Sequence, residues 1–266
     1  LGQPVLVENR PSASALVGTQ FVARAPADGY TLLATANTYA SAPSIVASPG
    51  YDPYMDFVGI TMTCRIPMAL VVNPSSPVRS VRELIALAKS KDGAVSYGSS
   101  GNGSTVHIAA ELFSRQAGVK MLHVPYKGNA PALTDLIGGQ ITMLFDQIST
   151  SSPHIRSGKV RALGVTTLTR AGILPDVPTI DESGLPGFED VTFNGIVAPT
   201  GTPAAIIDRL FTEITAVLAM PELRKRHGDQ GIELIASKSS QAFTEYLHAE
   251  TRKYAALAKE AGIKAD

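Results

Sequence analysis

Short apolar segments alternate with amphipathic helical segments along most of the chain. Apolar runs such as Val58–Thr63 and Ile141–Phe145 have the length and composition of buried strands. Apolar residues recur at helical spacing in Val81–Lys89 and Val106–Ala117. A chain that alternates in this way folds into a sheet covered by helices. The pattern therefore predicts an α/β fold with a parallel or mixed sheet.

The same periodicity predicts a definite set of elements. We expect strands at Val5–Val7, Thr31–Ala34, Val58–Thr63, Ala69–Val72, Val95–Tyr97, Ile141–Phe145, Arg161–Val165 and Asn194–Ala198. We expect helices at Leu16–Ala25, Val81–Lys89, Val106–Ala117, Ala130–Gly138, Ala204–Met220, Pro221–Gly228 and Gln241–Ala261, with a short helical turn at Ile155–Ser157.

The order of these elements predicts two domains that the chain enters and leaves twice. After Asn194–Pro199 the chain is mainly helical, apart from a weak strand pattern at Ile232–Ile235. This suits a chain that returns to complete its first domain. We therefore expect one domain at residues 1–96 and 198–266 and the other at residues 97–197. Two crossings place a ligand cleft between the domains.

The first ten residues have the pattern of a strand that begins directly at the start of the sequence. Leu1–Gln3 resembles the end of a preceding helix, so we expect a strand and a helix upstream of Leu1. A charged segment followed by an apolar one, as in an export signal, is not found at Leu1. If the protein is exported, its signal peptide is not present in this chain.

The charge balance indicates the kind of partner. Lys+Arg and Asp+Glu number 23 each, so neither a basic footprint for nucleic acid nor a polybasic face for a membrane is indicated. No run approaches the roughly eighteen apolar residues of a membrane-spanning helix. The single cysteine, Cys64, lies in an apolar segment and cannot form an intramolecular disulfide. A small molecule is the expected partner.

A loop rich in glycine and hydroxyl groups, Tyr97–Thr105, leads directly into the helix predicted at Val106–Ala117. A helix start offers unpaired N–H groups and a partial positive charge, and glycines let a ligand approach the backbone closely. The loop is therefore suited to an anion, most simply a carboxylate. Asn102, Ser104 or Thr105 also suits the plain role of a helix cap, and the two roles are compatible.

Two further strand-to-helix loops are expected at the same sheet edge. Tyr126-Lys127-Gly128 follows a strand-like segment, and Asp146 follows the strand at Ile141–Phe145. We expect Tyr126 to contact the ligand, whereas a lone lysine such as Lys127 is usually a solvated surface charge. Asp146 can accept a hydrogen bond from a solute, or it can cap the turn at Ser149-Thr150.

An enzyme is the alternative class, for instance a hydrolase with Ser104, His107 and Asp146 as nucleophile, base and orienting acid. The Gly-x-Ser-x-Gly elbow is absent, and Ser104 lies where a cap is needed. Dinucleotide and phosphate-loop motifs are absent as well, so we expect no cofactor. His107 and Glu111 are four residues apart on one helix, which indicates a helix-surface pair, and we expect no metal site.

Many short motifs resemble, in order and spacing, the solute-binding receptors of the tripartite tricarboxylate transporter, or Bug-type, family. They include Gln3-Pro4-Val5, Ala25–Leu33, Tyr51-Asp52-Pro53, Tyr97–Gly101, His123–Gly128, Pro131-Ala132-Leu133, Asp135-Leu136, Gly138-Gly139-Gln140, Phe145-Asp146 and Ala198–Pro203. The resemblance runs over essentially the whole chain. It implies a two-domain periplasmic-binding-protein (Venus-flytrap) fold and no enzymatic chemistry.

The resemblance also implies a function. Such a receptor captures a small organic carboxylate in the periplasm by domain closure and delivers it to membrane permease subunits. We expect a monomer and a mono- or dicarboxylate ligand, since few cationic side chains are expected at the cleft. A receptor that feeds a signalling partner would share the same site, so that alternative stays open.

The resemblance implies that the loop at Ser99–Thr105 is the second-domain anion site and that Asn37 and Thr38 lie in a first-domain loop at the cleft, although a simple turn is an equal alternative for these two. Together with the loops described above, the expected ligand-binding residues are Ser14, Asn37, Thr38, Ser99, Ser100, Gly103, Ser104, Thr105, Tyr126, Gly128, Asp146 and Asn194. Two segments depart from the family pattern. Residues 12–15 replace the usual glycines with Ser12, Ser14 and Ala15, and Asn194 replaces one of two aromatic residues. Both departures predict an altered ligand specificity.

Overall fold

A computed structural model of the chain describes residues 1–10, 12 and 15–263, with the backbone alone at residue 261. Contacts divide these residues into two compact units. Unit 1 comprises residues 1–65, 193–227 and those from 233 onward, whereas unit 2 comprises residues 66–192 and 228–232. Within the described residues, no helix combines the length and apolar character that a membrane span requires.

The boundaries between these units lie at 65/66 and 192/193, whereas the expected domains were divided at 96/97 and 197/198. The reason lies in β2 (Phe57–Val72), a single long strand in place of the two short ones expected. Its second half pairs with β5 (Met143–Gln147) and β6 (Arg161–Val165), so it belongs with unit 2. The division into independently moving domains stays a prediction.

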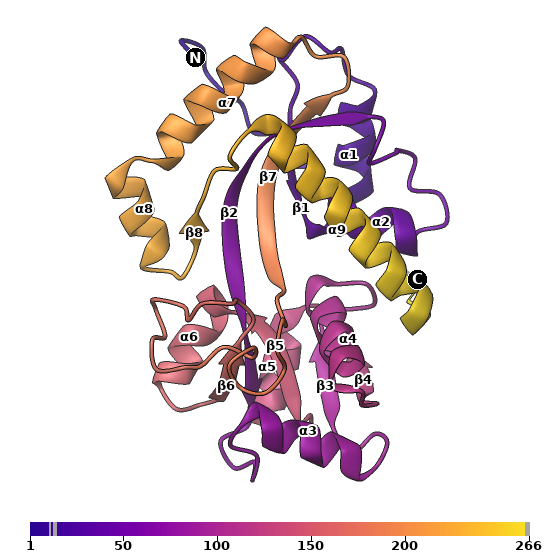
Figure 1. Cartoon of the computed structure of the whole chain (residues 1–266), viewed down its shortest axis with the longest axis vertical. Coiled ribbons are helices and arrows are strands. Elements are labelled where there is room, and N and C mark those ends of the chain that lie inside the picture. Colours follow the sequence, from indigo (N-terminus) through magenta and orange to yellow (C-terminus); the bar gives the residue numbers. More distant parts are fainter. Residues whose placement is uncertain (11, 13–14, 264–266) are drawn as a thin grey trace. The chain divides into compact units, whose positions relative to one another are not determined.

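Unit 1 is built around β1 (Leu33–Ala36), the first part of β2 and most of β7 (Val191–Pro199) (Figure 1). Its other elements are α1 (Leu16–Ala23), α2 (Asn37–Ile45), α7 (Ala204–Leu218), β8 (Glu233–Leu234) and α9 (Ser240–Ala261), and most of α8 (Pro221–Gly228). β1 and β7 are antiparallel, with Ala36 opposite Asn194. α7 buries Ile207 and Leu210 against Ile60 and Ala198.

The close approach of α9 to β7 requires a glycine. A Cβ atom on Gly195 would lie 2.1 Å from Cζ of Phe243, a fully buried ring on α9. No real contact is this short, so a larger residue would push the helix from the strand.

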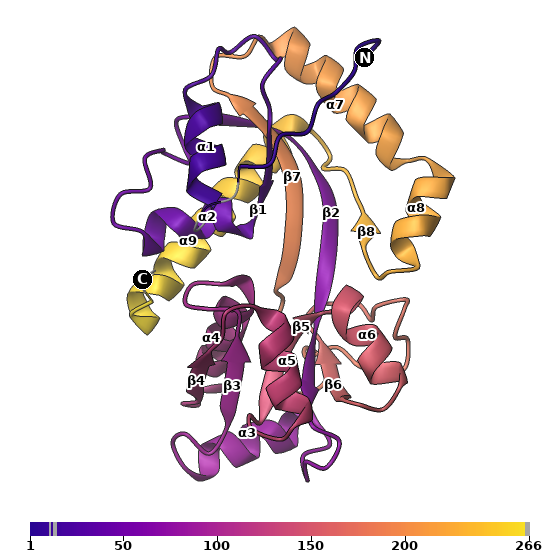
Figure 2. The same ribbon diagram turned by 180° about the vertical axis from the view of Figure 1, so that it is seen from behind.

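Unit 2 has helices on both faces of its sheet, as the two opposite views show for α4 and α5 (Figures 1 and 2). Its remaining elements are α3 (Val81–Ser90), β3 (Ser96–Ser99), α4 (Thr105–Ala117), β4 (Leu122–Pro125), α5 (Asn129–Ile137) and α6 (Ile148–Arg156). Side chains of β2 alternate between the faces. Leu70 packs with Leu84 and Phe113 of α3 and α4, whereas Val71 packs with Leu136 of α5.

Several expected elements differ from those observed. Residues 5–7 form no strand, and no strand of the described chain pairs with them; their side chains are 74%, 91% and 84% exposed. The helices α2 and α6 were missed or reduced to a turn because each contains a proline, Pro43 or Pro153, together with weak helix formers. The strand expected at Arg161–Val165 and the helix expected at Pro221–Gly228 are confirmed with the same ends, as β6 and α8. The expected strands near β3 and β5 and the helices near α7 and α9 are present with shifted ends.

Candidate functional site

Three neighbouring strands of unit 2 run parallel and end at one edge of its sheet. β3 lies between β4 and β5, with Ser99 opposite Pro125 and Gly98 opposite Leu144. In α/β folds, ligands bind beyond the carboxyl ends of such strands. The segments that follow the three strands therefore meet at this edge, which brings together the loop at Ser99–Ser104, the turn at Tyr126–Gly128 and Asp146.

Ser99 is fully buried and organises the first half of the loop. Its hydroxyl accepts the N–H of Gly101 at 3.1 Å and lies 2.6 Å from Nε2 of His123. Its carbonyl accepts the N–H of Tyr126 at 2.9 Å, which ties the β3 loop to the β4 loop. Ser99 therefore shapes the site from within, because its hydroxyl is already engaged by the protein.

The second half of the loop forms the start of α4. Ser104 is the cap, since its hydroxyl accepts the N–H of His107 at 3.4 Å. Gly103 has φ +71°, a left-handed conformation that favours glycine, and Gly101 has φ +120°. The N–H groups of Thr105 and Val106 lie in the first helical turn, where no intrahelical acceptor exists. This end of α4 therefore presents N–H donors and a partial positive charge to an anion.

A stack of three rings lies beneath the loop. The rings of His107 and His123 are parallel within 7°, with centroids 4.0 Å apart, and the ring of Tyr97 lies 4.9 Å from that of His123. Nδ1 of His107 accepts the N–H of Gly103 at 3.0 Å. The Tyr97 hydroxyl donates to the carboxylate of Glu111. The ring stack thus contacts the loop through both histidines.

Burial keeps these imidazoles neutral. Desolvation, with a contribution from nearby His123, lowers the pKa of His107 to about 4. Desolvation likewise lowers the pKa of His123 and raises the pKa of Tyr97. At neutral pH these rings therefore add no positive side-chain charge to the loop, and the positive groups that the loop itself offers are backbone N–H groups.

The turn after β4 contributes the phenol of Tyr126 and a glycine of positive φ, Gly128. The Tyr126 hydroxyl donates to Asp135 at 2.7 Å, and burial together with this carboxylate raises the pKa of Tyr126 to about 12. Gly128 has φ +118° and immediately precedes α5. Lys127 is exposed.

Asp146 is 1% exposed and lies at the end of β5. Its carboxylate accepts hydrogen bonds from the amide of Asn129 and from the hydroxyl of Thr150, the latter at 2.7 Å. Burial raises the pKa of Asp146, and these hydrogen bonds oppose that shift. Asp146 thus joins the starts of α5 and α6. Oδ1 of Asn129 is buried without a hydrogen-bond partner among the described residues.

The other predicted positions lie in unit 1. Asn37 starts α2 and is 2% exposed; its amide donates to the Tyr254 hydroxyl at 2.7 Å, and its Oδ1 accepts the N–H of Phe193 at 2.9 Å. Thr38 is half-buried beside it. Oδ1 of Asn194 accepts from the Cys64 thiol at 3.5 Å. Ser14 lies outside the described residues.

The hydrolase arrangement does not form. Ser104 accepts the backbone N–H of His107, and the acceptor nitrogen Nδ1 of His107 is occupied by the N–H of Gly103. The imidazole is therefore not available through Nδ1 to take a proton from the serine.

The prediction that His107 and Glu111 form a pair on the helix surface is wrong for His107, which is buried with 6% of its surface exposed. Its Nε2 lies 3.9 Å from Glu111. Among the described residues, no group of three metal-binding side chains comes together.

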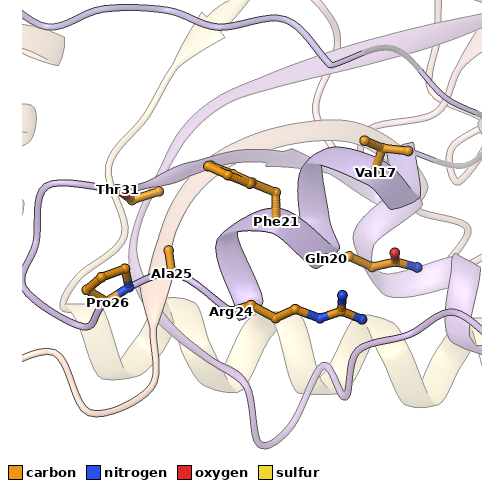
Figure 3. Close-up of a pocket in the computed structure, with 7 residues that line it drawn as sticks. All are labelled: Val17, Gln20, Phe21, Arg24, Ala25, Pro26 and Thr31. Atoms are coloured by element: carbon orange, nitrogen blue, oxygen red, sulfur yellow. The ribbon is translucent and has the colours of Figure 1, made fainter.

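A separate pocket of about 470 Å³ lies in unit 1, beside α1 and the turn that follows it (Figure 3). It is lined by Val17, Gln20, Phe21, Arg24, Ala25, Pro26 and Thr31. None of the predicted site residues contributes to this lining.

Three residues at the loop edge were not predicted from the sequence. Asn129 and Thr150 hold Asp146, and His123 supports Ser99. A signal for Asn129 existed, since it directly follows Gly128 at a predicted helix start. His123 gave none, because a single histidine in a short strand has no characteristic pattern.

Comparison with known proteins agrees with this architecture. The structure of R. palustris Rpa4515 with adipate has a TM-score of 0.82 and 35% identity, and the match covers 98% of this chain and 87% of that one. The periplasmic binding protein BugD has a TM-score of 0.78 and 35% identity, and the match covers 98% of this chain and 88% of that one. MatC (Rpa3494) from Rhodopseudomonas palustris with bound malate has a TM-score of 0.78 and 28% identity, and the match covers 96% of this chain and 88% of that one.

BugD is a periplasmic binding protein, and a further similar structure, from Polaromonas, is a TctC solute binding protein with a TM-score of 0.84 and 27% identity, in a match that covers 96% of this chain and 86% of that one. The fold is accordingly that of the α/β periplasmic binding proteins. The family model described as "Tripartite tricarboxylate transporter family receptor" matches residues 1–263. The chain therefore belongs to the receptor family of the tripartite tricarboxylate transporters.

Proposed function

We propose that this solute-binding protein captures a small organic carboxylate at the loop edge of unit 2. The observation that carries the proposal is the loop at Ser99–Thr105, which contains two left-handed glycines and ends at the start of α4, where the N–H groups of the first helical turn are presented. A bound carboxylate would contact the N–H groups of Thr105 and Val106 and the hydroxyls of Ser100 and Ser104.

A mono- or dicarboxylate fits this loop better than a tricarboxylate. Charge compensation comes from helix N–H groups, since the neutral rings of His107 and His123 add no positive charge. The adipate and malate held by two similar proteins are dicarboxylates and support this class. The polar group of the ligand that lies furthest from the loop would contact Tyr126, Gly128 or Asp146 through ordered water.

The remaining predicted residues, Asn37, Thr38, Asn194 and Ser14, would act on the first-domain side of the ligand. Binding would then shift an equilibrium between open and closed states, because the ligand gains contacts in the closed state alone. The protein would work in the periplasm as a monomer and deliver its solute to the membrane subunits of a tripartite transporter. Family membership supports this partner.

A thermal-shift screen tests the proposal. A ligand that binds only the folded protein raises the melting temperature by mass action. The panel should contain adipate, malate, citrate, amino acids and neutral sugars. We expect a shift with mono- or dicarboxylates and unchanged ligand after incubation. A shift with sugars alone, or conversion of any compound, would overturn the proposed function.

A further inference from the structure

Both imidazoles of the ring stack hold the loop through glycine peptides of left-handed conformation. His107 accepts the N–H of Gly103 directly at 3.0 Å. His123 contacts the Ser99 hydroxyl at 2.6 Å, and that hydroxyl accepts the N–H of Gly101 at 3.1 Å. The two imidazoles therefore determine which N–H groups of the loop turn inward. The N–H groups of the first turn of α4 are left for a ligand.

We propose that His107 is a positioning residue for carboxylate binding: its neutral ring holds the Gly103 peptide in the binding conformation, and a proton on Nδ1 releases the loop. This inference rests on the proposed function, because it concerns the same loop.

The chemical reason is a conflict between donors. Nδ1 can accept the Gly103 N–H only while it carries a lone pair, so the proton of neutral His107 resides on Nε2. A second proton on Nδ1 would place two donors 3.0 Å apart in a buried environment. The loop must then move, and the buried peptide loses its acceptor.

The groups that face His107 do not remove this conflict. β4 contributes His123, β3 contributes Tyr97, and α4 itself contributes Glu111, whose carboxylate lies 3.9 Å from Nε2 rather than at Nδ1. From β5, the apolar Met143 and Phe145 pack in the same core as α4. Glu111 is also engaged by the Tyr97 hydroxyl. None of these groups lies where it could accept a hydrogen bond from a protonated Nδ1 of His107.

Ligand and proton therefore compete for the same loop geometry. By linkage, a carboxylate that binds the intact loop must lower the pKa of His107 further. A simple electrostatic effect has the opposite sign, because a bound anion near an imidazole raises its pKa. The direction of the shift on binding distinguishes the two.

The test combines two variants with one titration. His107→Asn keeps an oxygen acceptor near the position of Nδ1 but does not titrate, whereas His107→Phe keeps a stacking ring but has no acceptor. Calorimetry with adipate and malate at pH 7.5 should give an affinity for His107→Asn within about threefold of wild type and a loss of about tenfold or more for His107→Phe. Circular dichroism establishes that both variants are folded.

The titration uses wild-type protein and so does not depend on either variant. The His107 imidazole is followed by NMR from pH 7.5 to pH 3.5, with and without saturating adipate. We expect a lower pKa in the complex. A raised or unchanged pKa, or an affinity of His107→Phe equal to wild type, would overturn this inference while the proposed function stands. Wild-type protein that binds no carboxylate contradicts both.

Discussion

The amide of Asn37 donates a hydrogen bond to the hydroxyl of Tyr254 at 2.7 Å, although 217 positions separate the two residues. The same side chain accepts the backbone N–H of Phe193 at 2.9 Å. One buried amide thus connects the start of α2 with α9 and β7. Asn37 supports the fold of unit 1 in addition to any contact with a solute.

Asn37→Ala should therefore destabilise the protein by about 1–3 kcal/mol, since it leaves the buried N–H of Phe193 without this acceptor. Urea unfolding measures the change. Thr38→Ala is the matched control, because Thr38 is the half-buried neighbour and its loss should cost less than about 0.5 kcal/mol. Equal stability of Asn37→Ala and wild type would show that the amide is dispensable.

Gly195→Ala should destabilise the protein by about 1–3 kcal/mol through overpacking. The new methyl group would meet the Phe243 ring at 2.1 Å. In Gly172→Ala the methyl group would have no neighbour within 4 Å, so that variant should match wild type. Thermal melts of the two variants check the difference. Comparable melting temperatures would mean that α9 can shift at no cost.

Stability should fall as the pH drops from about 6.5 to about 4. His107 has its pKa lowered to about 4 in the folded protein, so the unfolded chain binds more protons in this window. The loss approaches about 3 kcal/mol at the acid end. Unfolding at several pH values, in wild type and in His107→Asn, isolates the contribution. Parallel pH profiles of the two proteins would contradict the neutral, buried state of His107.

Asp146→Ala should weaken carboxylate binding by about tenfold and leave the protein folded, because the starts of α5 and α6 lose the acceptor that joins them. Thr150→Val removes a single donor to Asp146 and should have a smaller effect. Calorimetry with adipate at one pH compares them. An unchanged affinity in Asp146→Ala would remove this carboxylate from the site.

The helical third of the chain was predictable because its local signals agree. Pro203 and Pro221 stand at the entries of α7 and α8, and the period of α9 continues for six turns or so of amphipathic sequence. β2 was not predictable as one strand, because Arg65 and Pro67 interrupt its apolar pattern. Pairing with β5, β6 and β8 overrides that local signal.

The candidate site could be proposed from the sequence to the extent that its residues lie in one segment. Ser104 and Gly103 follow a strand and start a helix, and that pattern alone predicts an anion loop. Contacts between segments were not predictable, such as the stack of His107 on His123 or the bond from Asn129 to Asp146. These depend on the order of β3, β4 and β5 in the sheet, which local sequence does not encode.

Calorimetry of two double variants with adipate and malate tests whether the loop at Ser99–Thr105 binds the carboxylate. Ser104→Ala with Gly103→Ala removes the cap and the left-handed glycine of the loop. Ser80→Ala with Gly93→Ala makes the same changes at the cap of α3 and at another left-handed glycine, of φ +74°. Both should lose about 1 kcal/mol of stability for the cap and a similar amount for the backbone.

We expect the Ser104/Gly103 double variant to lose carboxylate affinity by about tenfold or more, whereas the Ser80/Gly93 double variant should bind like wild type. Equal affinity in the two double variants, with wild type binding normally, would contradict the assignment of the loop at Ser99–Thr105 as the carboxylate site.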